Sequence, residues 1–581
     1  MLADVTTYHD FETFLGSTSN KDGLFSFDSL LALDEKALYP EQQVEALNQW
    51  GLNRYFIPAA YGGKLTDLRD IYYYWFLLAR RDLTTAIAYG GTFLGALSVW
   101  VAGSEALRHK VAADILCHKK IAFSLTEREN GSDLLQTKVS ADYDAEADAF
   151  ELSGEKWLFN HASRSSFTSV LAKTSPDSGP RAYSMLYTPT LGEAADSVTV
   201  TGLDRIHTVG MRGLDLGGLV FNGHPVQGTS LVGKQGMGFE LAVTSMQVSK
   251  LLLGGLALGS LDTLFRTAVD FCRQRMLYKN EIIHIPILRL KLTSILLDML
   301  LAESFCLSGI RVAQVLPSQL SLLSVMVKAF VPSLVEKATG VLSGLLGARS
   351  FITSETDYRI FQKQARDNAI IPVFDGNTYV NYQLVIKQLE VVFALAETIR
   401  PPDPETLRRV YQLDVALPPV DFSRLSLLSK GKDDLAFGCL YLKEELSNGN
   451  MAEEEGTASI IEMLDMLILE MEKVRQWFLY EKGQSKTPYE MEAAVFHYAE
   501  RYTLLRAAGA VACMIFYNRK EIHPLLKWPL LLKLSLKKVI AALGGKYFDM
   551  QKEEEDMLMA YILHCNSNGY TFSLFPVKIA M

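Results

Sequence analysis

The spacing of hydrophobic and polar residues changes twice along the chain. Up to about residue 115, apolar positions recur at helical spacing, as in DLRDIYYYWFLLARRD (67–82) and TAIAYGGTFLGALSVWVAGSEALRHKVA (85–112). From about residue 118, short β-rich segments are separated by clusters of Gly, Pro, Asp and Ser. Helical spacing returns at Gly236 and continues to about residue 398. The pattern predicts helices, then a β-domain, then helices again.

The predicted fold class is α+β, with four domains. The β-rich segments, such as SSFTSVLAKT and GGLVFNGHPV, have the spacing of an antiparallel sandwich or barrel. Prolines in RPPDPET mark a linker, because Pro interrupts a helix. The predicted domains are an N-terminal helical domain (1–116), a middle β-domain (117–232), a C-terminal four-helix bundle (233–398) and an additional helical domain (405–581).

The additional domain has one clear amphipathic helix. Its apolar residues step by three and four, which places them on one face, as in Ile460, Leu464, Leu467, Met471, Val474 and Phe478. A second segment, HPLLKWPLLLKLSLKKVIAAL, has lysines beside an apolar face, as in a helix on a membrane surface. A buried helix is the favoured interpretation of that segment.

Composition and charge exclude several classes of function. The chain has 581 residues, of which 49% are hydrophobic, and a net charge of −9, so a nucleic-acid partner is not expected. Polar residues interrupt the most apolar region (285–347), which favours bundle helices over a membrane span. The N-terminus lacks the features of a secretory signal, and the six cysteines form no C-x-x-C pair. We expect a cytoplasmic protein without a metal site.

Several short motifs occur at the junctions between these segments. They are SLTERENGSD (124–133), GEKWLFNHAS (154–163), VGMRG (209–213), GKQGMGF (233–239), FCRQRMLYKNEIIHIPI (271–287), LLGARSFITSETDYRIFQKQARD (345–367) and VFDGN (373–377). In this order and at these distances, they resemble the motifs of the acyl-CoA dehydrogenase family of flavoproteins. The resemblance covers about residues 50 to 395.

The resemblance implies that FAD lies between the β-domain and the C-terminal helices. The groups at Ser124, Thr126 and Ser132 resemble the family's hydrogen-bond donors to the flavin. The residues Leu158, Phe159 and Asn160 resemble its wall against the flavin face, although Leu158 replaces the family's Trp and Asn160 its Thr. Taken alone, Trp157 and Phe159 are ordinary core aromatics of a strand.

Further positions resemble those that bind the cofactor of a neighbouring subunit. Arg275 matches an arginine that reaches the FAD pyrophosphate, for which a guanidinium is well suited. Tyr278 and Lys279 replace the family's Phe-Gly, and Gly347, Ala348 and Ser350 fall on its glycine-rich segment. Because two subunits then hold one cofactor, the resemblance implies a homodimer or tetramer.

Asp375 is the candidate catalytic residue. Asp-Gly is a common turn dipeptide, so the local sequence alone favours a turn. The resemblance changes this interpretation, because Asp375 follows Arg366 by nine residues, the interval to the family's catalytic Glu, which removes the α-proton of an acyl thioester. It also places Asn377 at the cofactor. Asp is one methylene shorter than Glu, so a turn or a vestige stays an alternative. The base position of some relatives is occupied here by Ser249, followed by Lys250.

The implied activity is FAD-dependent α,β-dehydrogenation of an acyl thioester, with the flavin N5 as hydride acceptor. The resemblance favours acyl groups on a carrier protein, as in bacterial polyketide and other secondary metabolism, with CoA as the second choice. LRHK (107–110), CHKK (117–120) and KWPLLLKLSLKK (527–538) are candidate docking patches for an acidic carrier. An electron-transfer flavoprotein or oxygen is the expected electron acceptor. The alternatives are a flavin oxidase, monooxygenase or lyase, or a catalytically impaired scaffold.

Overall fold

The computed structural model describes residues 5–191, 198–395, 402–448, 456–484 and 493–580. The chain forms two compact units. The bundle unit consists of Met1–Asn20, Lys250–Leu417 and Leu428–Met581, and the sheet unit of Lys21–Ser249 and Pro418–Leu427. The division falls inside one long helix, α7 (Gly238–Gln274).

The sheet unit begins with helices, most of which have a side-chain cap at their start. Asp82 accepts a hydrogen bond from the backbone N–H of Thr85 at 2.9 Å and so caps α5. Most side chains of α5 are buried, which explains why this helix is apolar on all faces. The helices are α2 (Phe27–Glu35), α3 (Glu41–Trp50), α4 (Leu68–Arg81), α5 (Leu83–Ala102) and α6 (Glu105–Leu116).

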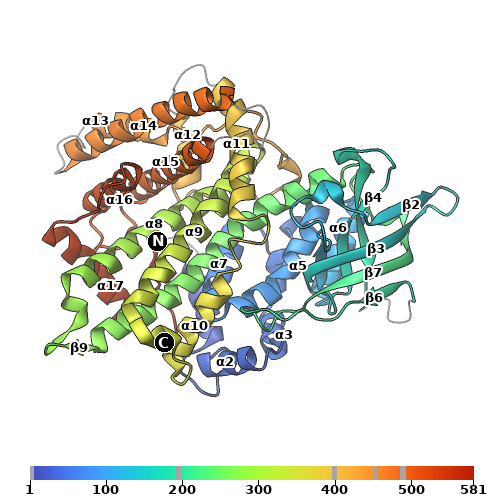
Figure 1. The fold of residues 1–581 in the computed structure, drawn as a ribbon, viewed down its shortest axis with the longest axis horizontal. Coiled ribbons are helices and arrows are strands. Elements are labelled where there is room, and N and C mark those ends of the chain that lie inside the picture. The colour runs from blue at the N-terminus through green and yellow to red at the C-terminus, as the bar shows by residue number, and fades with distance from the viewer. Residues whose placement is uncertain (1–4, 192–197, 396–401, 449–455, 485–492, 581) are drawn as a thin grey trace. The chain divides into compact units, whose positions relative to one another are not determined.

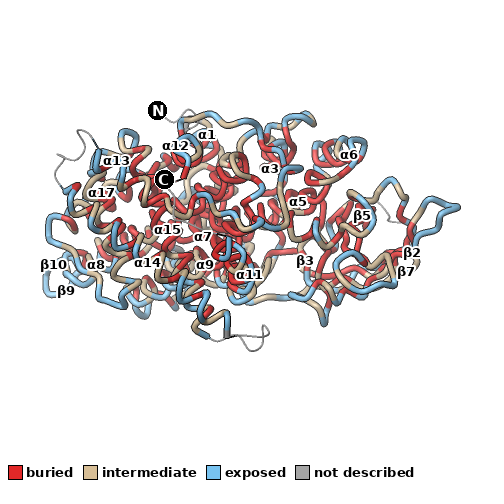
Figure 2. Tube along the Cα trace, turned by 90° about the horizontal axis from the view of Figure 1, so that it is seen from above, coloured by how far each residue is buried: buried red, intermediate tan, exposed pale blue. Residues whose placement is uncertain are grey.

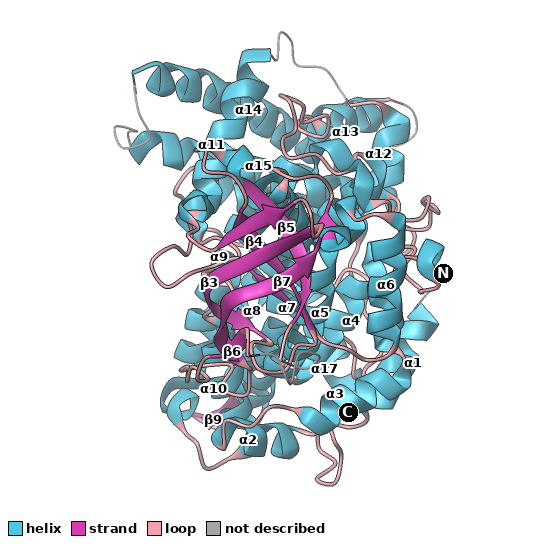
Figure 3. Cartoon of the chain, turned by 90° about the vertical axis from the view of Figure 1, so that its right-hand side faces the viewer, coloured by secondary structure: helices cyan, strands magenta, loops and turns pink. Residues whose placement is uncertain are grey.

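The described part of this unit contains one eight-stranded sheet (Figures 1 and 3). The strand order is β6-β7-β3-β2-β4-β5-β8, and β1 pairs with β4. The pairs β1–β4 and β2–β4 are parallel, unlike the predicted antiparallel arrangement, because long connections separate these strands in the sequence. The strands are β1 (Ile121–Ser124), β2 (Ser140–Asp144), β3 (Ala149–Asn160), β4 (Phe167–Lys173), β5 (Tyr183–Pro189), β6 (Val200–Gly202), β7 (Leu216–Gln227) and β8 (Leu231–Val232).

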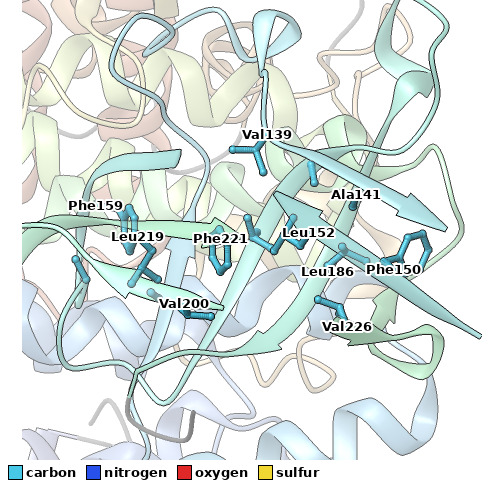
Figure 4. Close-up of a cluster of buried hydrophobic side chains, with 14 residues drawn as sticks. Val139, Ala141, Phe150, Leu152, Phe159, Leu186, Val200, Leu219, Phe221 and Val226 are labelled. Atoms are coloured by element: carbon cyan, nitrogen blue, oxygen red, sulfur yellow. The ribbon is translucent and has the colours of Figure 1, made fainter. Parts of the chain in front are cut away.

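Alternating side chains of the sheet form its hydrophobic core (Figure 4). In β3, Phe150 and Leu152 are buried, whereas Glu151 between them is exposed. Leu219 and Phe221 of β7 belong to the same cluster. Burial along this part of β3 therefore alternates with a period of two.

The bundle unit contains long helices that approach each other closely. A Cβ atom on Gly254 of α7 would lie 2.4 Å from Cys306 Sγ of α8, so only glycine allows this spacing. The tube in Figure 2 is largely red, or buried, along α7 and α15. The remaining elements before residue 396 are α1 (Val5–Leu15), β9 (Met276–Leu277), β10 (Asn280–Glu281), α8 (Pro286–Val315), α9 (Leu320–Leu346), α10 (Thr356–Asn368) and α11 (Thr378–Leu395).

The residues after 401 add more helices to the same unit. All six residues of the predicted apolar stripe, Ile460 to Phe478, are buried, which confirms the amphipathic helix α14. Helix α15 packs against α8 and α11, and the buried leucines of α16 match the buried-helix interpretation. These helices are α12 (Pro404–Tyr411), α13 (Gly438–Ser447), α14 (Thr457–Gln484), α15 (Ala493–Tyr517), α16 (Trp528–Leu543) and α17 (Lys552–Asn568).

The predicted domain limits can be compared with the elements. The limits at 116/117 and 232/233 coincide with the ends of α6 and β8, and the limit at 398 lies outside the described residues. The two compact units are a coarser division, and they group residues 1–20 with the bundle. Among the described residues, three helical stretches are long and apolar enough to cross a membrane, 83–102, 238–274 and 317–351, and 78% to 89% of their most apolar windows are buried inside the protein.

Candidate active site

A buried ion pair holds the segment SLTERENGSD (124–133) against strand β3. The Lys156 ammonium, which is completely buried, donates hydrogen bonds to a Glu127 carboxylate oxygen at 3.0 Å and to the Leu125 carbonyl at 2.8 Å. Backbone N–H groups of Lys138 and Val139 also donate to Glu127. Burial acts to raise the pKa of Glu127, but Lys156 and these donors outweigh it and lower this pKa.

The predicted flavin-binding hydroxyls occupy different environments. The Thr126 hydroxyl donates to the Trp157 carbonyl at 2.7 Å, and the Trp157 N–H donates to the Thr126 carbonyl at 3.0 Å. Ser124 is completely buried, and its hydroxyl lies 2.7 Å from that of Thr168. Ser132 is exposed in the loop before η3 (Leu134–Gln136). Thr126 therefore lies at the end of β3, whereas the Ser124 side chain is part of the sheet interior.

Strand β3 carries a bulge at the predicted flavin wall. The pairing with β7 shifts between Trp157 and Phe159, and Leu158 has a φ of 66°, in the left-handed region. The Leu158 side chain is 44% exposed, whereas Phe159 belongs to the sheet core (Figure 4). The bulge therefore turns one apolar side chain outward and leaves the next one inside.

Two polar side chains at the end of β3 have buried atoms with no hydrogen-bond partner among the described residues. Asn160 donates to the Ile87 carbonyl at 3.1 Å, but its Oδ1 has no donor there. Both ring nitrogens of His161 lack a partner, and burial lowers the pKa of His161 to about 3, so the ring is neutral. A Cβ on Gly91 would lie 2.6 Å from His161 Nε2. The sequence analysis missed His161, although it stands directly after the predicted wall.

Asp375 lies in the loop that joins α10 to α11 in the bundle unit. It is partly exposed and has a φ of 56°, a left-handed conformation that Asp adopts more readily than most residues. Gly376 follows with a φ of 85°. Asn377 then caps α11, because its Oδ1 accepts the N–H of Val380 at 2.9 Å. The local sequence was thus rightly interpreted as a turn, and the turn presents a carboxylate.

Two buried lysines from other helices interact electrostatically with Asp375. Lys328 of α9 is 1% exposed, and its Nζ donates to the carbonyls of Ile371 at 2.5 Å and Gly376 at 3.5 Å. Lys250 of α7 is 4% exposed. Burial lowers the pKa of Lys328 to about 7 and of Lys250 to about 8, while Asp375 acts to raise both. Sequence reasoning did not connect either lysine with Asp375, although a lysine inside the apolar run SVMVKAF was a signal.

The residues predicted to reach a second subunit's cofactor are exposed. Arg275 follows α7 directly, and Tyr278 and Lys279 form the two-residue turn between β9 and β10, with φ values of 51° and 69°. Both residues of such a turn usually favour Gly or Asn. The family's Phe-Gly is therefore replaced without loss of the turn. Tyr278 is 87% exposed.

The segment after α9 lies beside the end of α7. Gly347 has a φ of 59° and begins η8 (Gly347–Phe351), and a Cβ placed there would meet no atom within 4 Å. Ala348 is exposed, and the Ser350 hydroxyl donates to the Gly347 carbonyl at 2.8 Å. The Arg349 guanidinium lies 5.4 Å from the centre of the Phe271 ring of α7.

Two segments of the chain match models of a known protein family, and the sequence of a relative also matches the chain. Residues 122–224 match the acyl-CoA dehydrogenase middle domain, and residues 236–390 match the acyl-CoA dehydrogenase C-terminal domain. A probable acyl-CoA dehydrogenase of Mycobacterium tuberculosis, FadE25, is 24% identical over 358 residues, which cover 61% of this chain and 89% of the relative.

Two solved structures have a similar fold. Butyryl-CoA dehydrogenase from Megasphaera elsdenii has a TM-score of 0.60 at 18% identity, covering 66% of this chain and 97% of the other. The prolyl acyl carrier protein oxidase AnaB also has a TM-score of 0.60, at 16% identity, covering 66% of this chain and 98% of the other. The expected fold class is therefore confirmed, with added helices at the C-terminal end.

The cofactor of this family is FAD, and the residues present are compatible with it. The buried Oδ1 of Asn160 and the ring nitrogens of His161 need a polar partner that the described residues do not supply. Leu158 offers exposed apolar surface beside them. A flavin ring has both polar edges and apolar faces. This chain has the acyl-CoA dehydrogenase fold followed by further helices, and two of its segments match the middle and C-terminal domains of that family.

Proposed function

We propose that this protein is a FAD-dependent dehydrogenase that introduces an α,β double bond into an acyl thioester, with Asp375 as the base. The observation that carries the proposal is the position of Asp375 on a structured turn, under the electrostatic influence of two buried lysines. An opposite charge nearby favours the ionised form of a carboxyl group, and only that form accepts a proton.

The proposed reaction divides between the cofactor and the protein. Bound FAD supplies a two-electron acceptor for the hydride that leaves the β-carbon. Asp375 accepts the proton from the α-carbon, so that the α C–H bond breaks and a carboxyl O–H bond forms. In the sheet unit, Thr126, Leu158 and Asn160 are the residues that would hold the ring, with His161 supplying a neutral hydrogen-bonding side chain.

We further propose that the FAD pyrophosphate binds exposed cationic residues of a second subunit. Arg275 is exposed directly after α7, and Lys279 is exposed in the turn between β9 and β10. Arg349 lies over Phe271 of α7. Guanidinium groups suit a diphosphate because they donate parallel hydrogen bonds. Gly347 and Ala348 leave open space next to them. This assignment requires at least a homodimer.

The direct test is anaerobic reduction of the purified flavoprotein by saturated acyl thioesters. A matching substrate should bleach the flavin spectrum of the wild type. Asp375→Asn should bleach at least about a thousandfold more slowly while keeping its bound FAD, because an amide does not accept the proton. Glu336→Gln, which changes an exposed glutamate of α9, is the matched control. Equal bleaching by Asp375→Asn and the wild type would remove Asp375 from the proposed reaction.

The carrier of the acyl group is a finer proposal, supported by the similarity to a prolyl acyl carrier protein oxidase. The predicted basic patches add little support, because neighbouring acids neutralise them. Lys110 lies 2.8 Å and Lys119 3.6 Å from Asp114, and Lys533 lies 3.0 Å from Glu554. Single-turnover bleaching by the same acyl chain on CoA and on a carrier protein tests the preference. Equal rates would refute the preference for a carrier protein.

An oxidase is the second candidate activity, because AnaB is named as an oxidase. After substrate reduction, the flavin of an oxidase returns to its oxidised spectrum when air is admitted. A dehydrogenase that depends on an electron-transfer flavoprotein reoxidises slowly in air and rapidly when that partner is added. The reoxidation rate with each acceptor therefore distinguishes the two activities.

A further inference from the structure

Lys328 lies in the interior of the bundle unit, where a lysine is unusual. It is part of α9, between Val327 and Ala329, which are both completely buried, and it is itself only 1% exposed. An ammonium group removed from water requires compensation by hydrogen bonds or charge. The groups that supply this compensation indicate what Lys328 does.

The compensation comes from the loop that carries Asp375. Lys328 Nζ donates to the Ile371 carbonyl at 2.5 Å and to the Gly376 carbonyl at 3.5 Å, so one ammonium contacts the loop on both sides of Asp375. The Phe374 ring lies 5.7 Å from the same nitrogen, measured to its centroid. These contacts close the loop around a single cation.

The other hydrogen bonds of the loop secure its two ends. The Ile371 N–H donates to the Asn368 carbonyl at 3.0 Å, and the Asn381 side chain donates to the Gly376 carbonyl at 2.6 Å. These bonds tie the loop to the end of α10 and the start of α11. Lys328 contacts carbonyls on both sides of Asp375 and so joins these two ends to each other.

The charged groups that act on Lys328 are Asp375 in the loop and Lys250 on α7. Asp375 favours the ammonium form of Lys328, whereas burial and Lys250 oppose it. The carbonyls on both sides of Asp375 therefore bind a side chain whose charged form Asp375 itself favours.

We propose that Lys328 is a positioning residue for the base, because its ammonium fixes the turn that carries Asp375 through the Ile371 and Gly376 carbonyls. This inference rests on the proposed role of Asp375. It extends that role to a residue that lies 47 positions earlier in the sequence, on a different helix. Lys250 also interacts electrostatically with Asp375, but among the described residues no hydrogen bond joins it to the loop.

Three substitutions separate the two parts of this role. Lys328→Met removes both the charge and the donors, Lys328→Gln keeps an N–H donor without the charge, and Lys328→Arg keeps the charge. Lys538→Met is the matched control, because Lys538 is a largely buried lysine of α16 that binds Asp298 at 2.7 Å and Ser294. Bound FAD and melting temperature establish that each variant is folded.

The first measurement is the exchange of the substrate's α-proton with D2O, which reports proton removal without hydride transfer. Lys328→Met should exchange about tenfold more slowly, because a base displaced by about 1 Å is much less effective. In the wild type, exchange should also slow as the pH rises through about 7, because the ammonium form of Lys328 is then lost. Lys328→Met and Lys328→Gln should lack this decline, since nothing titrates at position 328, and Lys328→Arg should keep a fast rate above pH 7. A purely structural lysine would not give this pH dependence.

The second measurement needs no activity. The Lys328 side-chain amine can be followed by NMR in protein with labelled lysine, and identified by its loss in Lys328→Met. It should titrate near pH 7, and this titration should move to lower pH in Asp375→Asn but not in Glu336→Gln, because Asp375 acts to raise the pKa of Lys328. An unchanged titration in Asp375→Asn together with an unchanged exchange rate in Lys328→Met would overturn the inference. A moved titration in a protein whose wild type neither bleaches nor exchanges would keep the interaction of Lys328 with the turn and reject the proposed function.

Discussion

Asp375 and Glu303 are two carboxylates of the same helical unit, and their surroundings are opposite. Asp375 is partly exposed and interacts with the buried cations Lys250 and Lys328. Glu303 of α8 is deeply buried and accepts hydrogen bonds from the Ser573 hydroxyl and the Leu574 N–H, at the end of the chain. The charged group that acts on Glu303 is another acid, Asp262.

This difference separates a structural carboxyl group from a candidate catalytic one. Burial raises the pKa of Glu303 to about 7, with Asp262 adding to the rise and the two hydrogen bonds opposing it. Such a group keeps its proton below about pH 7 in the folded protein, and it anchors the last residues to α8. Asp375 instead acts to raise the pKa values of two buried lysines. A perturbed pKa alone therefore does not mark an active site; the sign of the neighbouring charge matters.

Removing the cation from the buried Lys156–Glu127 ion pair should have the largest effect on stability. In the sheet unit, Lys156→Met leaves the Glu127 carboxylate buried without its positive partner, which should lower the free energy of unfolding by about 3–5 kcal/mol. Thermal unfolding with and without added FAD measures the loss. The control is Lys138→Met, because Lys138 pairs with Glu129 where both side chains are more than 70% exposed. Similar losses in both variants would show that burial of the pair does not matter.

Glu303→Gln should reveal the raised pKa of Glu303 as a change in the pH dependence of stability. In the folded protein Glu303 keeps its proton up to about pH 7, whereas the unfolded chain releases it near pH 4.5. The wild type is therefore relatively more stable below pH 4.5 and loses about 3 kcal/mol as the pH rises to about 7. The variant does not titrate at this position. Its melting temperature relative to that of the wild type should therefore rise between pH 5 and pH 8.

The control for this prediction is Glu336→Gln, which changes an exposed glutamate of α9. Its melting temperature should follow that of the wild type at every pH. A Glu303→Gln variant whose difference from the wild type stays constant from pH 5 to pH 8 would show that Glu303 is ionised in the folded protein. The proposed difference between Glu303 and Asp375 would then not hold.

The sequence predicted the order of the elements well, because their periodicity is a local property. The α14 stripe and the limits of the sheet segment follow from spacing alone. The meeting of Lys250, Lys328 and Asp375 was not predictable in this way, since these residues come from three separate elements. The return of Ser573 to Glu303 joins residues 270 positions apart, which no periodicity indicates. His161 was missed because an isolated histidine has no pattern of its own.

Asp375→Glu tests how closely the turn fits its short side chain. The added methylene moves the carboxylate by about 1 Å, and Glu tolerates the left-handed conformation of position 375 less well than Asp. We expect flavin bleaching by the matching acyl thioester to slow by about ten- to a hundredfold, or about 1.4–2.7 kcal/mol in activation free energy. Bound FAD should not change. A variant that bleaches as fast as the wild type would show that the loop adapts to either side chain.

Ser573→Ala should have the smallest effect, and it should change the surroundings of Glu303 but not those of Asp375. The variant removes one hydrogen bond to a buried carboxyl group, which should lower the free energy of unfolding by about 1 kcal/mol. Because the Ser573 hydroxyl acts to lower the pKa of Glu303, its loss should extend the pH-dependent decline in stability to higher pH. Hydrogen exchange of residues 569–580, measured at pH 6 and pH 8, follows this locally. Bleaching by acyl thioesters should stay unchanged, and a loss of activity would mean that Glu303 and Asp375 are coupled through the bundle.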